Sequence, residues 1–330
     1  MEMVVSREIG SQTANPFRQS AALFPLATRP PHYLTVVPPA PVPEFGLGFS
    51  GAPVIDLEEL HLHGGPGDVV FFGIDCELNR RFGDANPGAA TFLRRHTACM
   101  APWTSSRGAP CQDIGIITAT DPDIAMRDAV ALAGYIAGLE RRPVLIGCDH
   151  TASLAGISGL LNTTDLEPIY IYLDAHYDLG RHGEPAPLGN GNFVDMLLQS
   201  ARIAKVVNIG GRSWATFNPV YHQVAYFQAV PQISAPEVIR ELDWLRGRTV
   251  YVSIDADVLD PTCAPNVCCP EPFGMAPTDL LAICEWLGKS CDVRGADLCE
   301  LMPAAQNMRS EQVLMRCVHA LFPAAGKACH

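Results

Sequence analysis

Three apolar runs, each followed within a few residues by aspartate and histidine, constrain the fold of this chain more than any other feature. The runs 143–146, 168–172 and 249–254 have the length and continuous apolar character of buried strands. Strands that are apolar on both faces belong to parallel sheets covered by helices. In such sheets ligands gather at the carboxyl ends of the strands. We therefore expect an α/β fold in which the polar strand ends meet at one edge.

The polar residues at these strand ends have the composition of a divalent-metal site. They are two histidines and four aspartates, namely His150, Asp174, His176, Asp178, Asp255 and Asp257. In an extended segment residues i and i+2 face the same way, so Asp174 and His176 project together. Four carboxylates packed together repel one another strongly unless cations lie among them. The set suits two divalent ions; the alternative is three strands that merely end in polar residues.

Composition excludes several classes of partner. The net charge of -12 argues against a nucleic-acid surface. No apolar run approaches the roughly 20 residues needed to span a membrane, and the start MEMVVSREIG does not have the pattern of a signal peptide. The 12 cysteines are scattered and form no C-x-x-C pair, which argues against a zinc–thiolate site. We expect a protein of the reducing cytoplasm.

The chain divides into a short arm and one large domain. Residues 1–55 are rich in proline, which predicts either an N-terminal arm that wraps a neighbouring subunit or a mobile tail. Residues 56–330 form the expected catalytic domain. Beyond the three runs, we expect strands near 69–74, 206–211 and 294–300, and helices near 121–139, 194–201, 235–245, 277–287 and 310–321, with a long irregular stretch after residue 74.

Three motifs resemble, in order, those of the ureohydrolase family, which includes arginase and agmatinase. They are G-C-D-H-T at 147–151, D-A-H-Y-D at 174–178 and S-I-D-A-D-V-L-D-P at 253–261. The resemblance extends over about residues 69–322. It implies a three-layer α/β/α arginase-like fold with a mostly parallel sheet. It also implies a homo-oligomer, either a trimer or a hexamer, or a hetero-oligomer with a paralogous subunit.

The resemblance assigns roles to the metal ligands. It places one ion on His150, Asp174, Asp178 and Asp255, and the other on His176, Asp174, Asp255 and Asp257, with Asp174 and Asp255 bridging. The ions are Mn²⁺ by family default or Ni²⁺, and oxygen and nitrogen donors permit either. A hydroxide between the two cations would attack a guanidinium carbon and release urea and an amine. Asp178 would also relay a proton, and Asp149 would orient neighbouring groups.

A glutamate from the last strand is the expected anchor of a small cationic guanidine-type substrate. The family's E-V-x-P is matched by E-L-M-P at 300–303, and a carboxylate such as Glu300 can pair two N–H groups of a guanidinium. The alternative is an exposed strand-end glutamate. Trp214 is expected to offer a ring face to the cation, or else to be a core residue.

Two loops depart from the family pattern and bear on the substrate. Asn190 stands where a proton-shuttling histidine is expected and takes its place in the catalytic set, although an amide does not shuttle protons in that way. His182, in the same loop, is either a substitute or an exposed residue. In the second loop Cys269 replaces a threonine hydroxyl, and Glu271 adds a carboxylate near the mouth.

These departures favour a small or N-alkylated guanidine or biguanide, such as guanidine or metformin, over arginine. An agmatinase-like or guanidinobutyrase-like hydrolase is an alternative. Two non-catalytic alternatives are a partner subunit of a hetero-oligomeric ureohydrolase and a module that senses a guanidine compound.

Overall fold

The computed structural model describes residues 48–80, 86–100, 109–180, 187–200, 202–213, 226–303 and 309–324. Most of the expected N-terminal arm, 1–47, lies outside these ranges, as do Trp214 and His182. The described end of the arm packs on the domain: Phe49 is buried, and Val54 forms a parallel bridge with Asp113.

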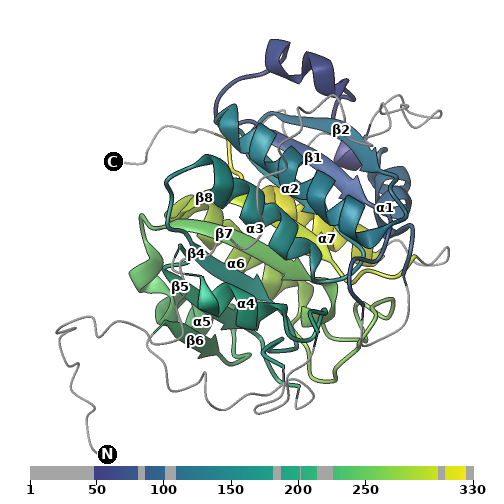
Figure 1. The fold of residues 1–330 in the computed structure, drawn as a ribbon. Coiled ribbons are helices and arrows are strands. Elements are labelled where there is room, and N and C mark those ends of the chain that lie inside the picture. Colours follow the sequence, from purple (N-terminus) through teal and green to yellow (C-terminus); the bar gives the residue numbers. More distant parts are fainter. Residues whose placement is uncertain are drawn as a thin grey trace, which may run out of the picture.

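One eight-stranded sheet, parallel throughout the described residues, forms the centre of the molecule (Figure 1). The strands are β1 (Val69–Ile74), β2 (Cys111–Ile117), β3 (Arg142–Ile146), β4 (Ile169–Leu173), β5 (Lys205–Ile209), β6 (Phe227–Val230), β7 (Thr249–Asp255) and β8 (Asp292–Cys299). Their order across the sheet is β2-β1-β3-β8-β7-β4-β5-β6. The predicted α/β fold is confirmed. The three motif-bearing strands, β3, β7 and β4, lie in the middle of the sheet, with β8 between β3 and β7.

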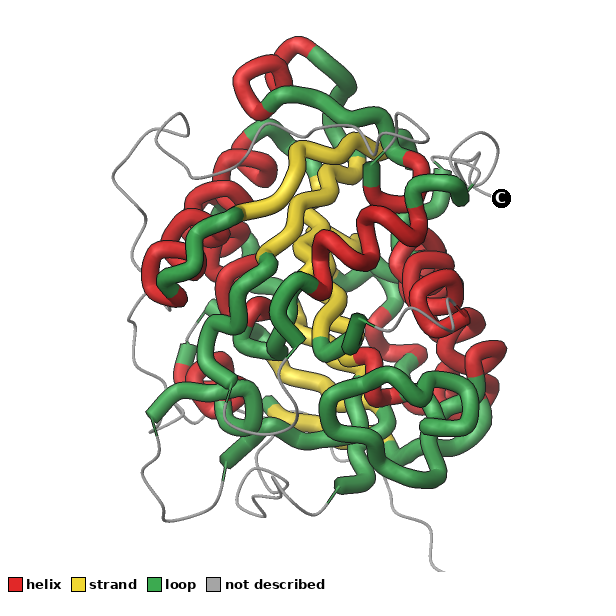
Figure 2. The backbone as a smooth tube through the Cα atoms, turned by 90° about the vertical axis from the view of Figure 1, so that its right-hand side faces the viewer, coloured by secondary structure: helices red, strands yellow, loops and turns green. Residues whose placement is uncertain are grey.

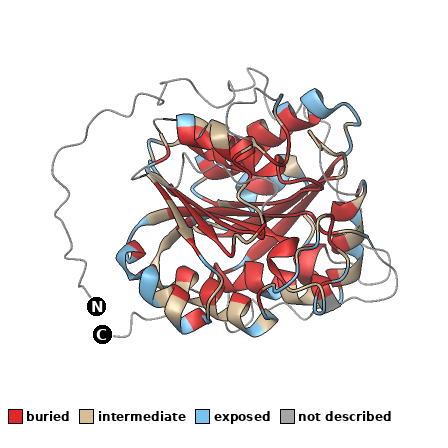
Figure 3. Ribbon diagram, turned by 90° about the horizontal axis from the view of Figure 1, so that it is seen from below, coloured by how far each residue is buried: buried red, intermediate tan, exposed pale blue. Residues whose placement is uncertain are grey.

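Helices cover both faces of the sheet, which gives the three predicted layers (Figures 2 and 3). One layer holds α2 (Pro122–Gly138), α3 (Ala152–Thr163) and α4 (Phe193–Gln199), and the other holds α1 (Ala89–Thr97), α5 (Ala235–Glu241), α6 (Pro277–Ser290) and α7 (Arg309–Ala320). Short 3-10 helices are η2 (Phe49–Gly51), η3 (Leu57–Leu62), η6 (Asp243–Leu245) and η7 (Ala256–Val258). Within the described ranges, no helix combines the length and the apolarity that a membrane span requires.

The strands separate two apolar cores because successive side chains point to opposite faces. In β4, Ile171 packs with the α5–α7 layer, whereas Tyr170 and Tyr172 pack with the α2–α4 layer. Both tyrosines and Ile171 are 0% exposed. With both faces filled by apolar groups, the strand ends are the places where this sheet can present polar side chains.

Among the α-helices and strands of the described residues, four were not expected from the sequence: α1, β2, α3 and β6. Helix α3 is buried over almost its whole length and therefore lacks the one-sided apolar pattern that marks a surface helix. Its small residues allow close packing. A Cβ at Gly156 would lie 1.9 Å from the Tyr251 hydroxyl, and one at Gly159 would lie 2.5 Å from a backbone oxygen of α2. In β2 the buried Asp113 interrupts the apolar run that would mark a strand.

Candidate active site

The carboxyl ends of β3, β4, β7 and β8 bring the sequence-predicted site residues together. His150 follows β3, and the 174–178 motif follows β4. Asp255 ends β7 and Asp257 lies in η7, while Glu300 directly follows β8. Because these strands are neighbours in the sheet, residues up to 150 positions apart in the chain meet at one edge.

The first group of donors surrounds His150. Its Nδ1 lies 3.0 Å from Asp174 Oδ2, 3.1 Å from Asp178 Oδ2 and 3.1 Å from Asp255 Oδ2. All four side chains are buried. His150 Nδ1 and Asp174 Oδ2 are buried atoms without a hydrogen-bond partner, although such atoms are nearly always paired. Three carboxylate oxygens converging on one ring nitrogen therefore fit a cation site.

The second group surrounds His176. Its Nδ1 lies 2.9 Å from Asp257 Oδ2 and 3.5 Å from Asp174 Oδ1. Asp174 thus presents one oxygen to each histidine, as a carboxylate between two cations would. Asp255 lies in the first group, and its Oδ1 accepts a hydrogen bond from Asp257 N at 2.8 Å. The six residues therefore form two adjoining groups that share Asp174.

Asp178 reaches the first group through an unusual backbone conformation. Its φ is +48°, in the left-handed region that non-glycine residues rarely adopt. This conformation turns the chain back after β4, so that the Asp178 carboxylate faces His150. Backbone strain of this kind concentrates at functional sites.

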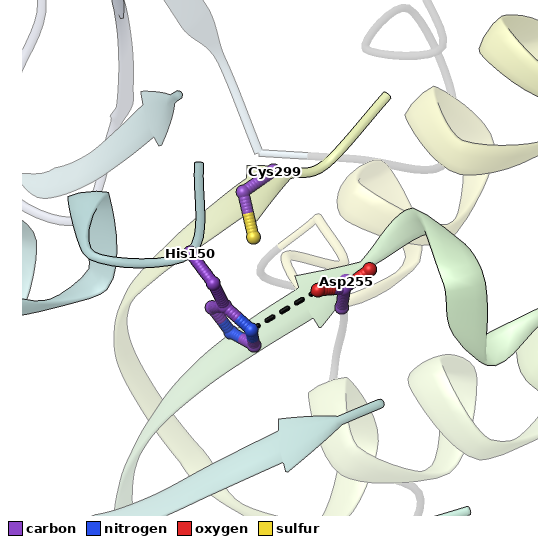
Figure 4. A group of neighbouring side chains, drawn as sticks. All are labelled: His150, Asp255 and Cys299. Atoms are coloured by element: carbon purple, nitrogen blue, oxygen red, sulfur yellow. Dashed lines mark ion pairs between the residues drawn. The ribbon is translucent and has the colours of Figure 1, made fainter. Parts of the chain in front are cut away.

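Cys299 is a neighbour of the cluster that sequence reasoning missed. Figure 4 shows its sulfur pointing toward His150 and Asp255, and ligand atoms of these three residues lie within 4.8 Å of one another. Cys299 is the last residue of β8 and directly precedes Glu300. Its position at a strand end was the available signal. Burial raises the pKa of its thiol well above the usual value, which favours the neutral form.

A buried chain of hydroxyls orients the His150 ring. Nε2 of His150 lies 2.8 Å from Ser253 Oγ, which donates to Asp297 Oδ1 at 2.6 Å. Ser153 Oγ donates to the same carboxylate oxygen at 2.8 Å. Since the single Ser253 proton goes to Asp297, Ser253 accepts from the Nε2–H of His150. Nδ1 therefore faces the carboxylates, and its lone pair is available to a metal ion once that nitrogen has lost its proton. Neither Ser153 nor Asp297 was predicted from the sequence.

The buried aspartates of the cluster lie close together, and their pKa values are shifted. Burial, reinforced by Asp174, raises the pKa of Asp178 to about 7. Burial, together with Asp257 and Asp174, raises that of Asp255 well above its ordinary value. Burial by itself would also raise the pKa of Asp174, but the neighbouring His150 and His176 imidazoles outweigh it and lower that pKa.

We expect the metal-free protein to lose stability as pH rises from about 4 to about 7. In this window the folded state keeps a proton on Asp178 that the unfolded chain, titrating near 3.8, has released. A folded state that binds more protons becomes less stable as pH rises. The opposite shift of Asp174 acts below its ordinary pKa of 3.8 and so outside the window. Burial lowers the pKa of His319 to about 4, which opposes the trend within the window, whereas the raised pKa of Asp255 adds to it. Thermal melting of chelator-treated protein at pH 5 and pH 7.5 measures this dependence.

Reloading with metal supplies the control for that measurement. Metal binding requires deprotonated ligands, so the rise in melting temperature on adding Mn²⁺ should be larger at pH 7.5 than at pH 5. A metal-free protein that melts at a higher temperature at pH 7.5 than at pH 5 would contradict the expectation.

Asp149 stands behind the cluster and joins two loops. It is fully buried, and its Oδ2 accepts from Leu78 N at 2.5 Å and Asn79 N at 3.2 Å. Its Oδ1 accepts from Thr151 N at 3.0 Å. The side chain thus ties the loop after β1 to the start of α3, which is an orienting position.

Glu300 is buried at 4% exposure, and both of its carboxylate oxygens have donors. Oε1 accepts from His150 N at 2.9 Å and from Asn190 Nδ2 at 3.2 Å. Oε2 accepts from Arg80 Nη2 at 2.8 Å. Asn190 therefore contacts Glu300. The Arg80 contact was not expected from the sequence.

The segment after η7 approaches His176. Glu271 Oε1 lies 3.7 Å from His176 Nε2. Cys269 is half-buried, and burial raises the pKa of its thiol to about 12, with His176 and Glu300 among the charged groups that act on it. Arg212 holds this segment by donating to the backbone oxygens of Asp257 and Glu271, each at 2.9 Å. Glu271 and Cys269 thus lie beside the second group of donors.

Comparison with known proteins agrees with this architecture. The Arginase family model matches residues 67–322. A formimidoylglutamase of Nocardia farcinica is 24% identical over 275 residues, which cover 78% of this chain and 86% of that protein. An agmatinase of Halalkalibacterium halodurans is 31% identical over 168 residues, which cover 50% of this chain and 57% of that protein. A crystal structure of Trypanosoma cruzi formiminoglutamase with Mn²⁺ superposes with a TM-score of 0.65 at 17% identity, covering 77% and 92% of the two chains.

Proposed function

This chain belongs to the arginase family of hydrolases acting on amidino carbon–nitrogen bonds, and we propose that it works through two divalent ions at the strand-end cluster. The observation that carries the proposal is the convergence of two histidines and four aspartates in two groups that share Asp174. A cluster with this many buried carboxylates is poorly explained as an apolar core feature.

The residues present fit two cations. His150, Asp174, Asp178 and Asp255 would hold one, and His176 and Asp257 would hold the other together with Asp174 and Asp255. The unpartnered Nδ1 of His150 and Oδ2 of Asp174 support this assignment. Divalent cations bound there would make water acidic enough to supply a nucleophile near neutral pH. Mn²⁺ is the ion named for the Trypanosoma cruzi relative, and Ni²⁺ is equally compatible with the oxygen and nitrogen donors.

The protein's own groups would position the substrate and move protons. Asp178, turned back toward His150, is proposed to pass a proton to the leaving nitrogen. Asn190 is proposed to orient Glu300 through its amide rather than to shuttle protons, which is supported by its 3.2 Å contact. Cys269 and Glu271 are proposed to border the substrate at the mouth.

The proposed substrate is a small or N-alkylated guanidine or biguanide, with guanidine and metformin as test compounds. Its support is the pair of altered loops, which place a buried amide and a thiol near the cluster. A second candidate is an N-formimidoyl compound, in which hydrogen replaces the third nitrogen on carbon. It is favoured by the occupied Oε2 of Glu300, which leaves fewer acceptors for that nitrogen. Agmatine and guanidinobutyrate remain alternatives.

A substrate panel tests the function and the substrate together. Protein loaded with Mn²⁺ or Ni²⁺ would be assayed for urea release from guanidine, agmatine, guanidinobutyrate and arginine, and for formamide release from N-formimidoylglutamate. With metformin, the assay would measure dimethylamine together with guanylurea, or urea together with N,N-dimethylguanidine. We expect arginine to be disfavoured by at least about a hundredfold in kcat/KM, because the altered loops at Asn190 and Cys269 change the polar groups that would border the substrate. Metal-free protein is the control. Strong arginine turnover would overturn the substrate proposal, and no turnover of any amidine by fully loaded protein would overturn the catalytic one.

The same preparation tests the partner-subunit alternative. A supporting subunit should purify without two bound metal ions, whereas the proposed enzyme should retain both. We propose further that the chain assembles as a homo-oligomer and resides in the cytoplasm. Eleven cysteines in the described residues are free thiols, which suits a reducing compartment.

A further inference from the structure

Arg80 contacts the carboxylate that the substrate would be expected to use. Its Nη2 donates to Glu300 Oε2 at 2.8 Å, and the two side chains are only 7% and 5% exposed. The residues are 220 positions apart in the chain, so the contact is a product of the fold. The group that Arg80 presents is a guanidinium, the same chemical group that a guanidine substrate would present.

A network of hydrogen bonds holds Arg80 in this position. Its Nε donates to Glu77 Oε1 at 2.5 Å, and its Nη2 also donates to Asn86 Oδ1 at 2.7 Å. Asn86 Nδ2 in turn donates to Cys148 O at 2.6 Å and Leu301 O at 3.1 Å. These carbonyls follow β3 and β8, so the network ties Arg80 to the strand ends that carry the site.

The contacts leave Glu300 with little capacity for another cation. One oxygen accepts from His150 N and Asn190, and the other accepts from Arg80. The Arg80 charge offsets the Glu300 charge. A second guanidinium would meet an acceptor that is already paired and a like charge beside it, in a buried setting where such interactions are little screened.

We infer that Arg80 is a specificity-determining residue, a guanidinium supplied by the chain itself that competes with a substrate guanidinium for Glu300. The inference rests on the proposed function and sharpens it. With Arg80 in place, the site binds a guanidinium head weakly. It also discriminates less between guanidines and amidines that lack the third nitrogen than the same site would without Arg80. Removing Arg80 turns Glu300 into an open guanidinium anchor.

Arg80→Met tests this inference through binding, without turnover. Equilibrium dialysis of metal-stripped protein with radiolabelled guanidinium ion, at constant ionic strength, measures the dissociation constant. We expect Arg80→Met to bind guanidinium about tenfold more tightly than the wild type, because a charge-assisted pair with Glu300 becomes available. A purely structural arginine would give a loss or no change. In metal-loaded protein, kcat/KM should shift toward guanidine relative to N-formimidoylglutamate.

The double variant Arg80→Met/Glu300→Gln isolates the role of Glu300. The double variant keeps the aspartate cluster, so any guanidinium that binds at the cluster contributes equally to the two measurements. We expect the tenfold gain in affinity of Arg80→Met to vanish in the double variant. Arg94→Met is the matched control, since Arg94 forms a comparable ion pair at 2.6 Å with the buried Asp113 outside the site. It should leave guanidinium binding unchanged. Arg80→Gln, which keeps an amide for the network, replaces Arg80→Met if that variant does not fold.

A folded Arg80 variant that binds guanidinium no more tightly than the wild type would overturn the inference. So would a gain that survives in the double variant. These outcomes are separate from failure of the proposed function, which is decided by turnover in the substrate panel. A tenfold gain in binding without any turnover would leave the inference standing and remove only the catalytic proposal.

Discussion

Replacing Asp174 with alanine is expected to remove both metal ions and to lower kcat/KM on the best amidine substrate by at least about a thousandfold. Asp174 presents Oδ2 to His150 and Oδ1 to His176, so a single substitution withdraws a ligand from each group. Loss of one ion would also leave the remaining carboxylates without a neutralising charge, which weakens the second site. Elemental analysis of the purified variant, together with product release at saturating substrate, measures both effects.

Asp292→Ala is the matched control for that experiment. Asp292 begins β8 and so lies at the opposite end of the same sheet, where it pairs with Arg294 at 2.7 Å. The control should keep both ions and its activity. If the Asp174→Ala protein retained two ions per chain, or turned over substrate at a rate near that of the wild type, the assignment of Asp174 as the shared ligand would be wrong.

Replacing Ser253 with alanine is expected to weaken metal binding by about 10- to 100-fold without removing any proposed ligand. Ser253 accepts the Nε2–H of His150 and thereby keeps the Nδ1 lone pair toward the carboxylates. Without the hydroxyl, the ring loses its preferred tautomer and orientation. Titration of metal-stripped protein with Mn²⁺ gives the affinity, and activity should recover at high Mn²⁺ because the ligands are intact.

Ser153→Ala separates this orienting role from a general effect on the buried hydroxyls. Ser153 donates to the same Asp297 oxygen and lies 3.0 Å from Ser253 Oγ, but its hydroxyl is not the group that faces His150. Its removal should change Mn²⁺ affinity much less than removal of Ser253. Equal losses in the two variants would show that the network acts through packing or stability and not through the His150 ring.

The central strands and the six proposed ligands could be anticipated because both leave local signals. The apolar runs that became β3, β4 and β7 are continuous, as strands buried on both faces must be. Asp174 and His176 follow such a run directly. By contrast, α3 escaped notice because a helix buried on nearly all sides has no polar face to set its period.

The missed site residues share a different cause. Arg80 meets Glu300 across 220 positions, and Ser153 meets Asp297 across 144. No spacing rule within the sequence connects such pairs, since their proximity depends on which strands become neighbours. The anchoring role expected for Glu300 was therefore inferred without its partner, and the pairing with Arg80 changes what that carboxylate is available to bind.

The place of β8 in the sheet also bears on how the molecule is made. This strand is the last in the described chain, yet it pairs with β3 on one side and β7 on the other, with Val144 opposite Ala296. During synthesis β3 and β7 each keep one edge unpaired until β8 has been made. Pairings between strands this distant along the chain form slowly. A ribosome-bound chain that stops before residue 292 lacks the strand that joins His150 to Asp255. We therefore expect metal uptake to begin only after β8 has been made and has paired with β3 and β7.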